Sequence, residues 1–312
     1  MKVGIITPKG PAFRTGNRAT ADRWAHFLRE LGHEVEVKEA WSGGDEDAGV
    51  FLHARKSHPS IKRYAETGRP LVVILTGTDL YRDFSEKETQ ESLELATRLV
   101  VLQEAALEKL EERHRVKARV VHQSAEPVKR EPPSERYFDV LVAGNLRPEK
   151  DPFRAAAAAK LLPRSSRVRV AHAGASPDEE WTELALAHAA TNPRYRWLGE
   201  TPHWRVRELL SRARLFVQSS TMEGGANTTS EALVAGVPVL ASRIPGNTGM
   251  LGKDYPGYFP VQDEEVLAHL LHRAETDAYF HALLAERCAE RAPLFLPERE
   301  KVSLWELLAG LY

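Results

Sequence analysis

Two glutamates, Glu223 and Glu231, stand eight positions apart and enclose the glycine pair Gly224 and Gly225. The segment between the acids, GGANTTS, is small and polar, and a short apolar helix pattern follows it. A helix that begins near Thr228 offers free N–H groups and a positive dipole end, which suit a diphosphate. Carboxylates repel phosphate but accept hydrogen bonds from sugar hydroxyls. The pattern therefore indicates a ligand with a central diphosphate and a sugar at each end.

A structural interpretation of the same two acids stays open. The segment from Thr228 to Glu231 fits a capping box, in which Glu231 only closes the start of the helix. Glu223 would then be a solvated loop acid. The glycine pair, which lets backbone approach an anion closely, and the continuation EALVAGVPVLAS favour the functional interpretation.

A basic pair follows the strand pattern of residues 138–145. Arg147 and Lys150 lie in the stretch GNLRPEKDP, directly after Gly144. Cations at the carboxyl end of a strand would stabilise the charge that grows on a departing nucleoside diphosphate. A solvated surface loop is the alternative interpretation.

Polar and cationic residues also follow strand patterns in the first half of the chain. The loop TPKGPAFRTGNRAT contains Arg14, Gly16, Asn17 and Arg18, and it lacks the G-x-G-x-x-G order of a nicotinamide-binding loop. The strand-closing segments LHARKSH and LTGTDLYRDF contain His53, Arg55, Lys56, Thr76, Thr78, Asp79 and Arg82. Each of these features has a structural alternative. The first loop could be a plain flexible loop. His53 could be a packed histidine at a strand end, and Asp79 could be a helix N-cap.

Alternating strands and helices must position these residues. The first half has strand patterns at residues 2–7, 34–40, 49–54, 70–77, 98–103 and 118–123, with helical patterns at 18–33 and 58–68. A polar, proline-rich linker at 123–136 is followed by strand patterns at 138–145, 167–174, 195–199, 214–220 and 237–242, and by helical patterns at 151–162 and 297–312. The alternation predicts an α/β protein with two doubly wound parallel sheets. Ligands are then expected at the carboxyl ends of the strands, between the two domains. Asp151 and Pro152 are the expected N-cap and first residue of the 151–162 helix.

Composition narrows the functional class. A chain of 312 residues suits two domains, and a net charge of -1 gives no strong attraction to nucleic acid or to a membrane surface. The single cysteine, Cys288, excludes a disulfide framework and a cysteine-based zinc site within one chain. No apolar run approaches the ~18 residues of a membrane span, so a cytoplasmic protein is expected.

The segment EGGANTTSEALVAGVPVLAS resembles the E-x7-E signature of retaining glycosyltransferases of the GT-B superfamily. The resemblance implies two Rossmann-like domains that face a central cleft: residues 1–126 on the acceptor side, a linker at 127–136, a nucleotide-sugar domain at 137–295, and a helix at 296–312 that returns to the first domain. It implies that Glu231 anchors the ribose and that Glu223 contacts the donor sugar. The implied catalytic residues are Arg147, Lys150, Glu223 and Asp79, the last in place of a histidine or acid that the family often has near the transferred sugar. The implied donor-binding residues are Gly16, Asn17, Gly144, Gly199, Gly224, Gly225, Ala226, Asn227, Thr228 and Glu231.

Further segments, GNRATADRW, LHARKS, LTGTDLYRD and MEGGAN among them, resemble the selenosugar synthase family of selenoneine biosynthesis. That resemblance implies transfer of glucose or N-acetylglucosamine from a UDP-sugar to selenophosphate, with loss of phosphate to leave a 1-seleno sugar. It also implies functional coupling to a selenophosphate synthetase and a selenoneine synthase. Selenophosphate is small and highly charged, so its pocket should be cationic. The implied acceptor-binding residues are Arg14, Arg18, His53, Arg55, Lys56, Thr76, Thr78 and Arg82.

No metal and no other cofactor are expected. The one D-x-D sequence, Asp45 to Asp47, lies in a predicted loop outside the expected site. Three alternatives to the selenium chemistry stay open. They are a hexosyltransferase with an ordinary hydroxyl acceptor, a UDP-sugar epimerase of the same fold, and a nucleotide-sugar sensor without turnover.

Overall fold

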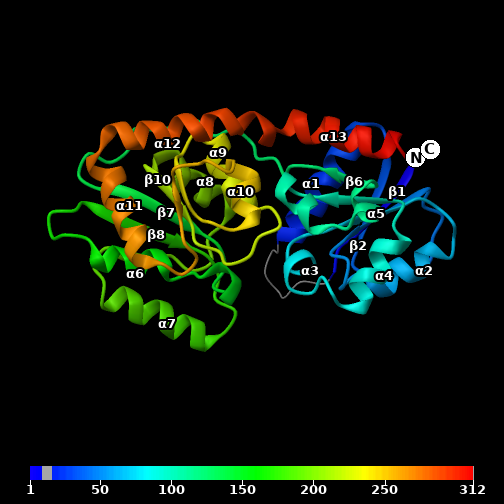
Figure 1. Cartoon of the computed structure of the whole chain (residues 1–312), viewed down its shortest axis with the longest axis horizontal. Helices are drawn as coiled ribbons and strands as arrows, with labels where there is room; N and C mark the ends of the chain where they lie inside the picture. The colour runs from blue at the N-terminus through cyan, green and yellow to red at the C-terminus, as the bar shows by residue number, and fades with distance from the viewer. Residues whose placement is uncertain (9–15, 312) are drawn as a thin grey trace. The chain divides into compact units, whose positions relative to one another are not determined.

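A computed structural model describes residues 1–8 and 16–311, and two compact units make up the chain. The first unit contains Met1–Gln123, Glu223–Gly225 and Pro297–Tyr312, and the second contains Ser124–Met222 and Ala226–Leu296. The short segment Glu223–Gly225 therefore groups with the first unit, although the residues on both sides of it group with the second. Figure 1 labels the helices and strands of both units.

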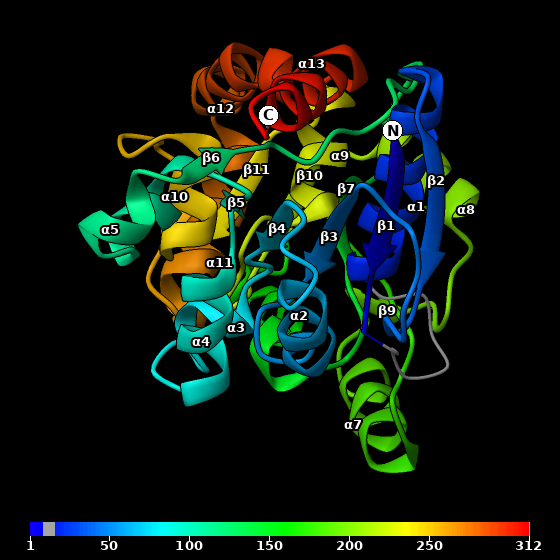
Figure 2. The same ribbon diagram turned by 90° about the vertical axis from the view of Figure 1, so that its right-hand side faces the viewer.

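The first unit is built on a parallel sheet of six strands in the order β2-β1-β3-β4-β5-β6, which runs from right to left in Figure 2. Its strands are β1 (Lys2–Ile6), β2 (Glu34–Lys38), β3 (Ala48–Leu52), β4 (Leu71–Ile74), β5 (Arg98–Val101) and β6 (Ala118–Val120). The central strands β3 and β4 are buried at every residue, as expected of continuous apolar runs that are covered on both faces. All six strands were predicted from these runs.

Helices cover both faces of this sheet. They are α1 (Gly16–Glu30), α2 (His58–Ala65), α3 (Thr78–Tyr81), α4 (Lys87–Leu95), α5 (Glu112–Arg115) and α13 (Pro297–Ala309), with the 3₁₀ helix η1 (Glu104–Lys109). One apolar core joins α1 and α13 to the strands, and a second core includes residues of α2 and α4.

The C-terminal helix α13 returns to the first unit, as predicted, and lies beside α1 (Figure 1). Its Glu300 is buried and accepts hydrogen bonds from Trp24 Nε1 at 2.7 Å and from Arg23 Nε at 2.8 Å. A buried carboxylate needs such donors, because burying a charge without partners is costly. The paired acid therefore fixes α13 against α1.

The second unit has its own parallel six-stranded sheet, in the order β12-β11-β10-β7-β8-β9. The strands are β7 (Phe138–Ala143), β8 (Val168–Ala173), β9 (Tyr195–Trp197), β10 (Leu215–Gln218), β11 (Val239–Ser242) and β12 (Tyr258–Phe259). The helices are η2 (Pro148–Lys150), α6 (Arg154–Leu161), α7 (Glu179–Ala190), α8 (His203–Arg212), α9 (Asn227–Val234), α10 (Pro245–Leu251), α11 (Glu264–Thr276), α12 (Ala278–Arg291) and η3 (Ala292–Phe295). In Figure 1, α6 and α7 lie below this sheet and α9 and α12 lie above it.

Two predicted helix starts are wrong. The helix expected at 151–162 begins only at Arg154, because Asp151 adopts a left-handed conformation with φ 42° after η2. Asp151 does not cap the helix, and its carboxylate instead pairs with Arg154 Nε at 2.8 Å. The first helix already includes Gly16 and Asn17, two residues ahead of the pattern expected at 18–33.

Both strand orders contain a point where the order reverses. This point lies between β1 and β3 in the first sheet and between β7 and β10 in the second. Open α/β sheets bind ligands outside the carboxyl ends of the strands at such a point. In the described part of the chain, no helix is both long and apolar enough to span a bilayer.

Candidate active site

The basic loop after β7 is tied to the end of β10 in the second unit. The N–H of Thr221 donates to Glu149 O at 2.9 Å, and Ser219 Oγ donates to Asp151 O at 2.9 Å. Gly144, Lys150, Ser219 and Ser220 line one small cavity at this point, where the strand order reverses. The fold thus holds Arg147 and Lys150 at the carboxyl ends of two neighbouring strands.

Arg147 itself is half-buried, and its guanidinium forms no hydrogen bond or ion pair with another described residue. Its backbone is fixed, because the N–H of Lys150 donates to Arg147 O at 3.0 Å. An anion site requires a cationic side chain whose backbone is fixed and whose charge is not already paired within the protein.

Helix α9 carries the second glutamate of the motif. It begins at Asn227 after the N-cap residue Ala226, which makes no side-chain cap hydrogen bond, so Glu231 lies too far along the helix for the alternative interpretation as a capping box. Glu231 lies beyond the first turn, and its Oε1 is 3.0 Å from Nε2 of His203, the first residue of α8. With the capping role removed, the carboxylate of Glu231 is available for a ligand.

The first glutamate is not a solvated loop acid, since Glu223 is buried. Close packing explains why Gly224 and Gly225, the two residues after Glu223, are glycines. A Cβ on Gly224 would lie 2.4 Å from Thr76 O, and a Cβ on Gly225 would lie 2.7 Å from Leu102 Cβ. The pair lets the backbone of Glu223–Gly225 pack within the first unit on the loop that follows β4.

That loop, Thr76–Asp79, is organised by a buried carboxylate. Asp79 Oδ1 accepts from the backbone N–H groups of Thr76 and Gly77, both at 2.9 Å, and Oδ2 accepts from that of Ala54 at 2.8 Å. Asp79 has no exposed surface. Because both oxygens are engaged and enclosed, the predicted catalytic role of Asp79 is not supported, and the carboxylate instead joins the loops after β3 and β4.

His53, the residue after β3, is also held inside this arrangement. It is buried, with a left-handed φ of 70°, and its Nδ1 accepts from the N–H of Lys56 at 3.3 Å. The proton therefore lies on Nε2, which donates to Thr78 Oγ1 at 2.9 Å. Burial lowers the pKa of His53, against the nearby Asp79. A neutral, buried His53 orients the Thr78 hydroxyl and does not act as a surface cation.

Three predicted acceptor cations lie on the same two loops. Arg55 and Arg82 both pair with Asp83, at 3.4 Å and 3.2 Å, while Lys56 is exposed. Burial opposes ionisation of Asp83, but the two guanidinium groups outweigh it and lower its pKa. Asp83, which the sequence did not single out, thus neutralises part of the charge and holds the two arginines side by side. Each guanidinium keeps further N–H donors for an anion.

The remaining predicted residues do not cluster with one another. Arg18 pairs with Asp22 one helical turn away at 2.9 Å, and Arg14 lies outside the described residues. Gly199 adopts a positive φ of 70° in the turn after β9, where its carbonyl accepts from the N–H of Gly174. Gly199 therefore shapes this turn of the second unit.

His172 on β8 supports the start of the basic loop at Gly144, and no sequence pattern pointed to this histidine. Gly144 O can only accept, so His172 Nε2 donates to it at 3.0 Å, and Nδ1 accepts from the Tyr195 hydroxyl at 2.9 Å. Complete burial lowers the pKa of His172 to about 4 from an ordinary value of 6.5. The ring is therefore neutral at physiological pH and bonded on both nitrogens.

This burial predicts a pH dependence. Between pH 6.5 and about 4 the unfolded chain binds a proton at His172 that the folded chain does not. Stability consequently falls as the pH falls through that window, by about 3 kcal/mol at most. Urea unfolding of the wild type and of His172→Gln at pH 7 and pH 4.5 measures it. The variant should lose less stability between the two pH values, and an equal loss in both proteins would contradict the assignment.

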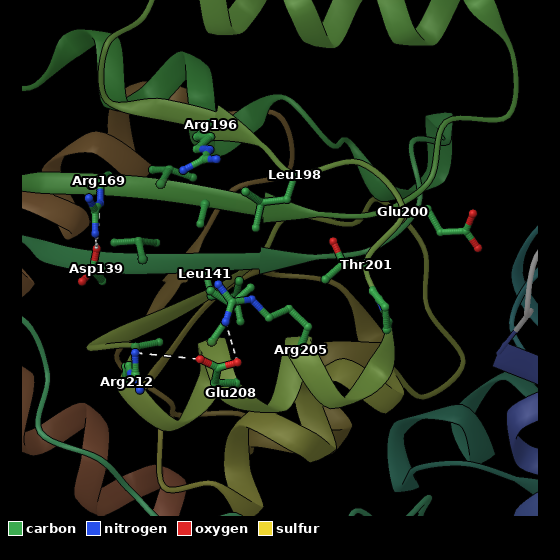
Figure 3. A pocket seen from close by; sticks show the side chains of 16 residues that line it. Asp139, Leu141, Arg169, Arg196, Leu198, Glu200, Thr201, Arg205, Glu208 and Arg212 are labelled. Atoms are coloured by element: carbon green, nitrogen blue, oxygen red, sulfur yellow. Dashed lines mark hydrogen bonds and ion pairs between the residues drawn. The ribbon is translucent and has the colours of Figure 1, made fainter.

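A cavity of about 510 Å³ lies elsewhere in the second unit, along β7, β8, β9 and α8 (Figure 3). Its charged lining is largely paired, with Arg169 on Asp139 at 2.8 Å and Arg205 on Glu208 at 2.5 Å. None of the predicted site residues lines it. Among the described residues, no group of three or more His, Cys, Asp or Glu side chains could hold a metal ion.

The sequence profile of the family described as Glycosyl transferases group 1 matches residues 123–295, which is more than half of the chain. The chain belongs to this family. The match covers the basic loop, the E-x7-E segment and both strands that they follow. Comparison with curated proteins finds no match.

Solved structures show the fold of this family member. It is similar to HepE (Alr3699) of Anabaena in complex with UDP and glucose, with 16% identity, a TM-score of 0.78, and coverage of 99% of this chain and 100% of that one. Sucrose-phosphate synthase of Thermosynechococcus elongatus gives 15% identity, a TM-score of 0.81, and coverage of 99% and 98%. TarM of S. aureus gives 14% identity, a TM-score of 0.66, and coverage of 92% and 58%. The predicted GT-B fold, with its two parallel six-stranded sheets, is confirmed.

Proposed function

We propose that this glycosyltransferase moves the sugar of a UDP-sugar, UDP-glucose or UDP-N-acetylglucosamine, to selenophosphate. In the proposed reaction, selenium attacks C1 of the sugar, the C1–O bond to UDP breaks, and UDP leaves. Water then cleaves the Se–P bond, which releases phosphate and leaves a 1-seleno sugar. The selenium of selenophosphate is a strong nucleophile, so the enzyme has little need of a general base.

The main support for a UDP-sugar donor is the arrangement of residues at the carboxyl ends of β7 and β10. Hydrogen bonds from Ser219 and Thr221 hold the loop of Arg147 and Lys150 there. Helix α9 supplies its N-terminus and the Glu231 carboxylate. Cations and helix N–H groups suit a diphosphate, and a carboxylate suits ribose hydroxyls. The UDP-glucose bound to HepE and the family match support a UDP-sugar donor.

The acceptor side rests on the cations of the first unit. Arg55 and Arg82, held by Asp83, and the exposed Lys56 follow β3 and β4. Their charge fits a small anion better than a neutral alcohol. The resemblance of LHARKS and LTGTDLYRD to selenosugar synthases supports selenophosphate as that anion.

The proposal is tested by measuring UDP release from each donor with selenophosphate, with inorganic phosphate, with a simple alcohol, and with no acceptor. UDP release should rise to saturation with selenophosphate and stay at background in the other arms. EDTA should leave the rate unchanged, since Arg147, Lys150 and α9 are proposed to take the place of a metal. Release that is indifferent to selenophosphate would rule out this acceptor. Release that requires an alcohol would identify a hydroxyl-directed hexosyltransferase.

A further inference from the structure

Helix α8 begins with a histidine that contacts the motif glutamate of another helix. His203 is the first residue of α8, and its Nε2 lies 3.0 Å from Glu231 Oε1 on α9. The two residues are 28 positions apart, so the contact depends on the fold of the second unit and not on helical neighbours. His203 is more than half exposed, while only 17% of the Glu231 side chain is exposed.

Exposed ion pairs usually contribute little to stability, so the contact has no evident value as a stabilising pair. Its effect on Glu231 is more specific. A glutamate side chain has three rotatable bonds, and one fixed oxygen removes much of that freedom. Oε2 is then presented in one direction, and either protonation state of the imidazole can supply the Nε2–H donor.

The helix that carries His203 is itself anchored. Arg207 donates from both terminal nitrogens to Glu126 O at 3.0 Å and Pro127 O at 2.9 Å. Arg130 donates to Ala213 O, just past the end of α8, at 2.7 Å. A side chain on a fixed helix start can hold a partner in a productive orientation before a ligand binds, which lowers the entropic cost of binding.

We propose that His203 is a positioning residue for the nucleotide: it holds Glu231 so that the free carboxylate oxygen meets a ribose hydroxyl. This inference rests on the proposed function, because it takes the ligand to be a uridine nucleotide with its ribose on Glu231. His203 does not contact the reacting atoms, so it acts on affinity and on discrimination at the ribose and leaves the chemical step alone.

Binding of UDP and of 2′-deoxy-UDP to the whole protein, measured by calorimetry, tests this role. A hydrogen bond to a carboxylate contributes about 1.5–3 kcal/mol, so the wild type should prefer UDP by roughly tenfold or more. His203→Ala should weaken UDP binding about five- to tenfold and leave 2′-deoxy-UDP binding unchanged, which reduces the preference for ribose. His203→Gln, which keeps a donor, should recover much of it. His269→Ala, at an exposed histidine of α11 in the same unit, is the matched control and should match the wild type.

The outcomes separate the two proposals. If His203→Ala binds UDP as tightly as the wild type, or loses both nucleotides equally, the positioning role is wrong while the donor assignment stands. If the wild type binds no UDP, the proposed function is wrong and this inference with it. If the wild type binds UDP with the expected ribose effect but releases none in the presence of selenophosphate, only the acceptor assignment is wrong.

Discussion

Replacing Arg147 by alanine is expected to lower kcat/KM by about 10²–10³, mostly through kcat, and to leave the fold intact. The physical reason is the charge that develops on the UDP leaving group, which a preorganised donor stabilises by an amount of that order. The guanidinium of Arg147 has no partner among the described residues, so its removal breaks no structural contact. Stability should therefore change by no more than about 0.5 kcal/mol.

Steady-state UDP release and urea unfolding of Arg147→Ala measure the two quantities separately. Arg164→Ala is the control, because Arg164 is an exposed arginine of the same unit outside the candidate site. A wild-type rate in Arg147→Ala would contradict the assignment of the leaving-group site. A large loss of stability would show that the residue has a structural role instead.

Replacing Asp79 by alanine is expected to destabilise the first unit by about 3 kcal/mol or more and to lower turnover only as a consequence. The substitution leaves the N–H groups of Ala54 and Gly77, which are buried, and of Thr76, which is partly buried, without an acceptor, and each loss at a buried group costs about 1–3 kcal/mol. It also frees the loop that carries Thr78 and packs against Gly224. Asp79→Asn should be destabilised less, because its amide retains one acceptor oxygen.

Urea unfolding of the whole protein, followed by tryptophan fluorescence, measures the change, since the first unit contains the buried Trp24 and Trp41. Glu66→Ala removes an exposed acid from the same unit and should behave as the wild type. If Asp79→Asn loses turnover but keeps wild-type stability, Asp79 has a catalytic role and the structural role inferred from its burial is wrong.

The strand pattern was sufficient to predict most of the fold. Long apolar runs such as 70–77 and 138–145 identify parallel strands because both faces of those strands are covered. β12 was missed because two residues, Tyr258 and Phe259, leave no detectable period. The start of α6 was misplaced because the left-handed conformation of Asp151 is set by the preceding 3₁₀ turn and not by capping preference.

The candidate site was predicted in part, and the misses have one cause. Residue types and their position after strands located the loops of Arg147 and His53 and the helix of Glu231. Which oxygen or nitrogen atoms of each side chain form hydrogen bonds or ion pairs within the protein depends on tertiary contacts, and the spacing of residues in the sequence does not encode these contacts. The three backbone N–H groups on Asp79, the pairing of Asp83 with two arginines, and the contact of His203 with Glu231 are of this kind.

The glycine pair illustrates the same limit. Its flexibility was read as room for an anion, whereas the contacts of Gly224 with Thr76 show that backbone packing already demands glycine there. A sequence motif thus served a second purpose that only the folded chain reveals.

The most direct test of the account is the structure of the product made by the purified protein from a UDP-sugar labelled with carbon-13 at C1 and selenophosphate. Carbon and selenium NMR, with mass spectrometry, should find a sugar with a C1–Se bond, formed together with one UDP and one phosphate per sugar. Free hydrolysed sugar, an oxygen-linked product or an epimerised donor, in place of the seleno sugar, would contradict the proposed reaction.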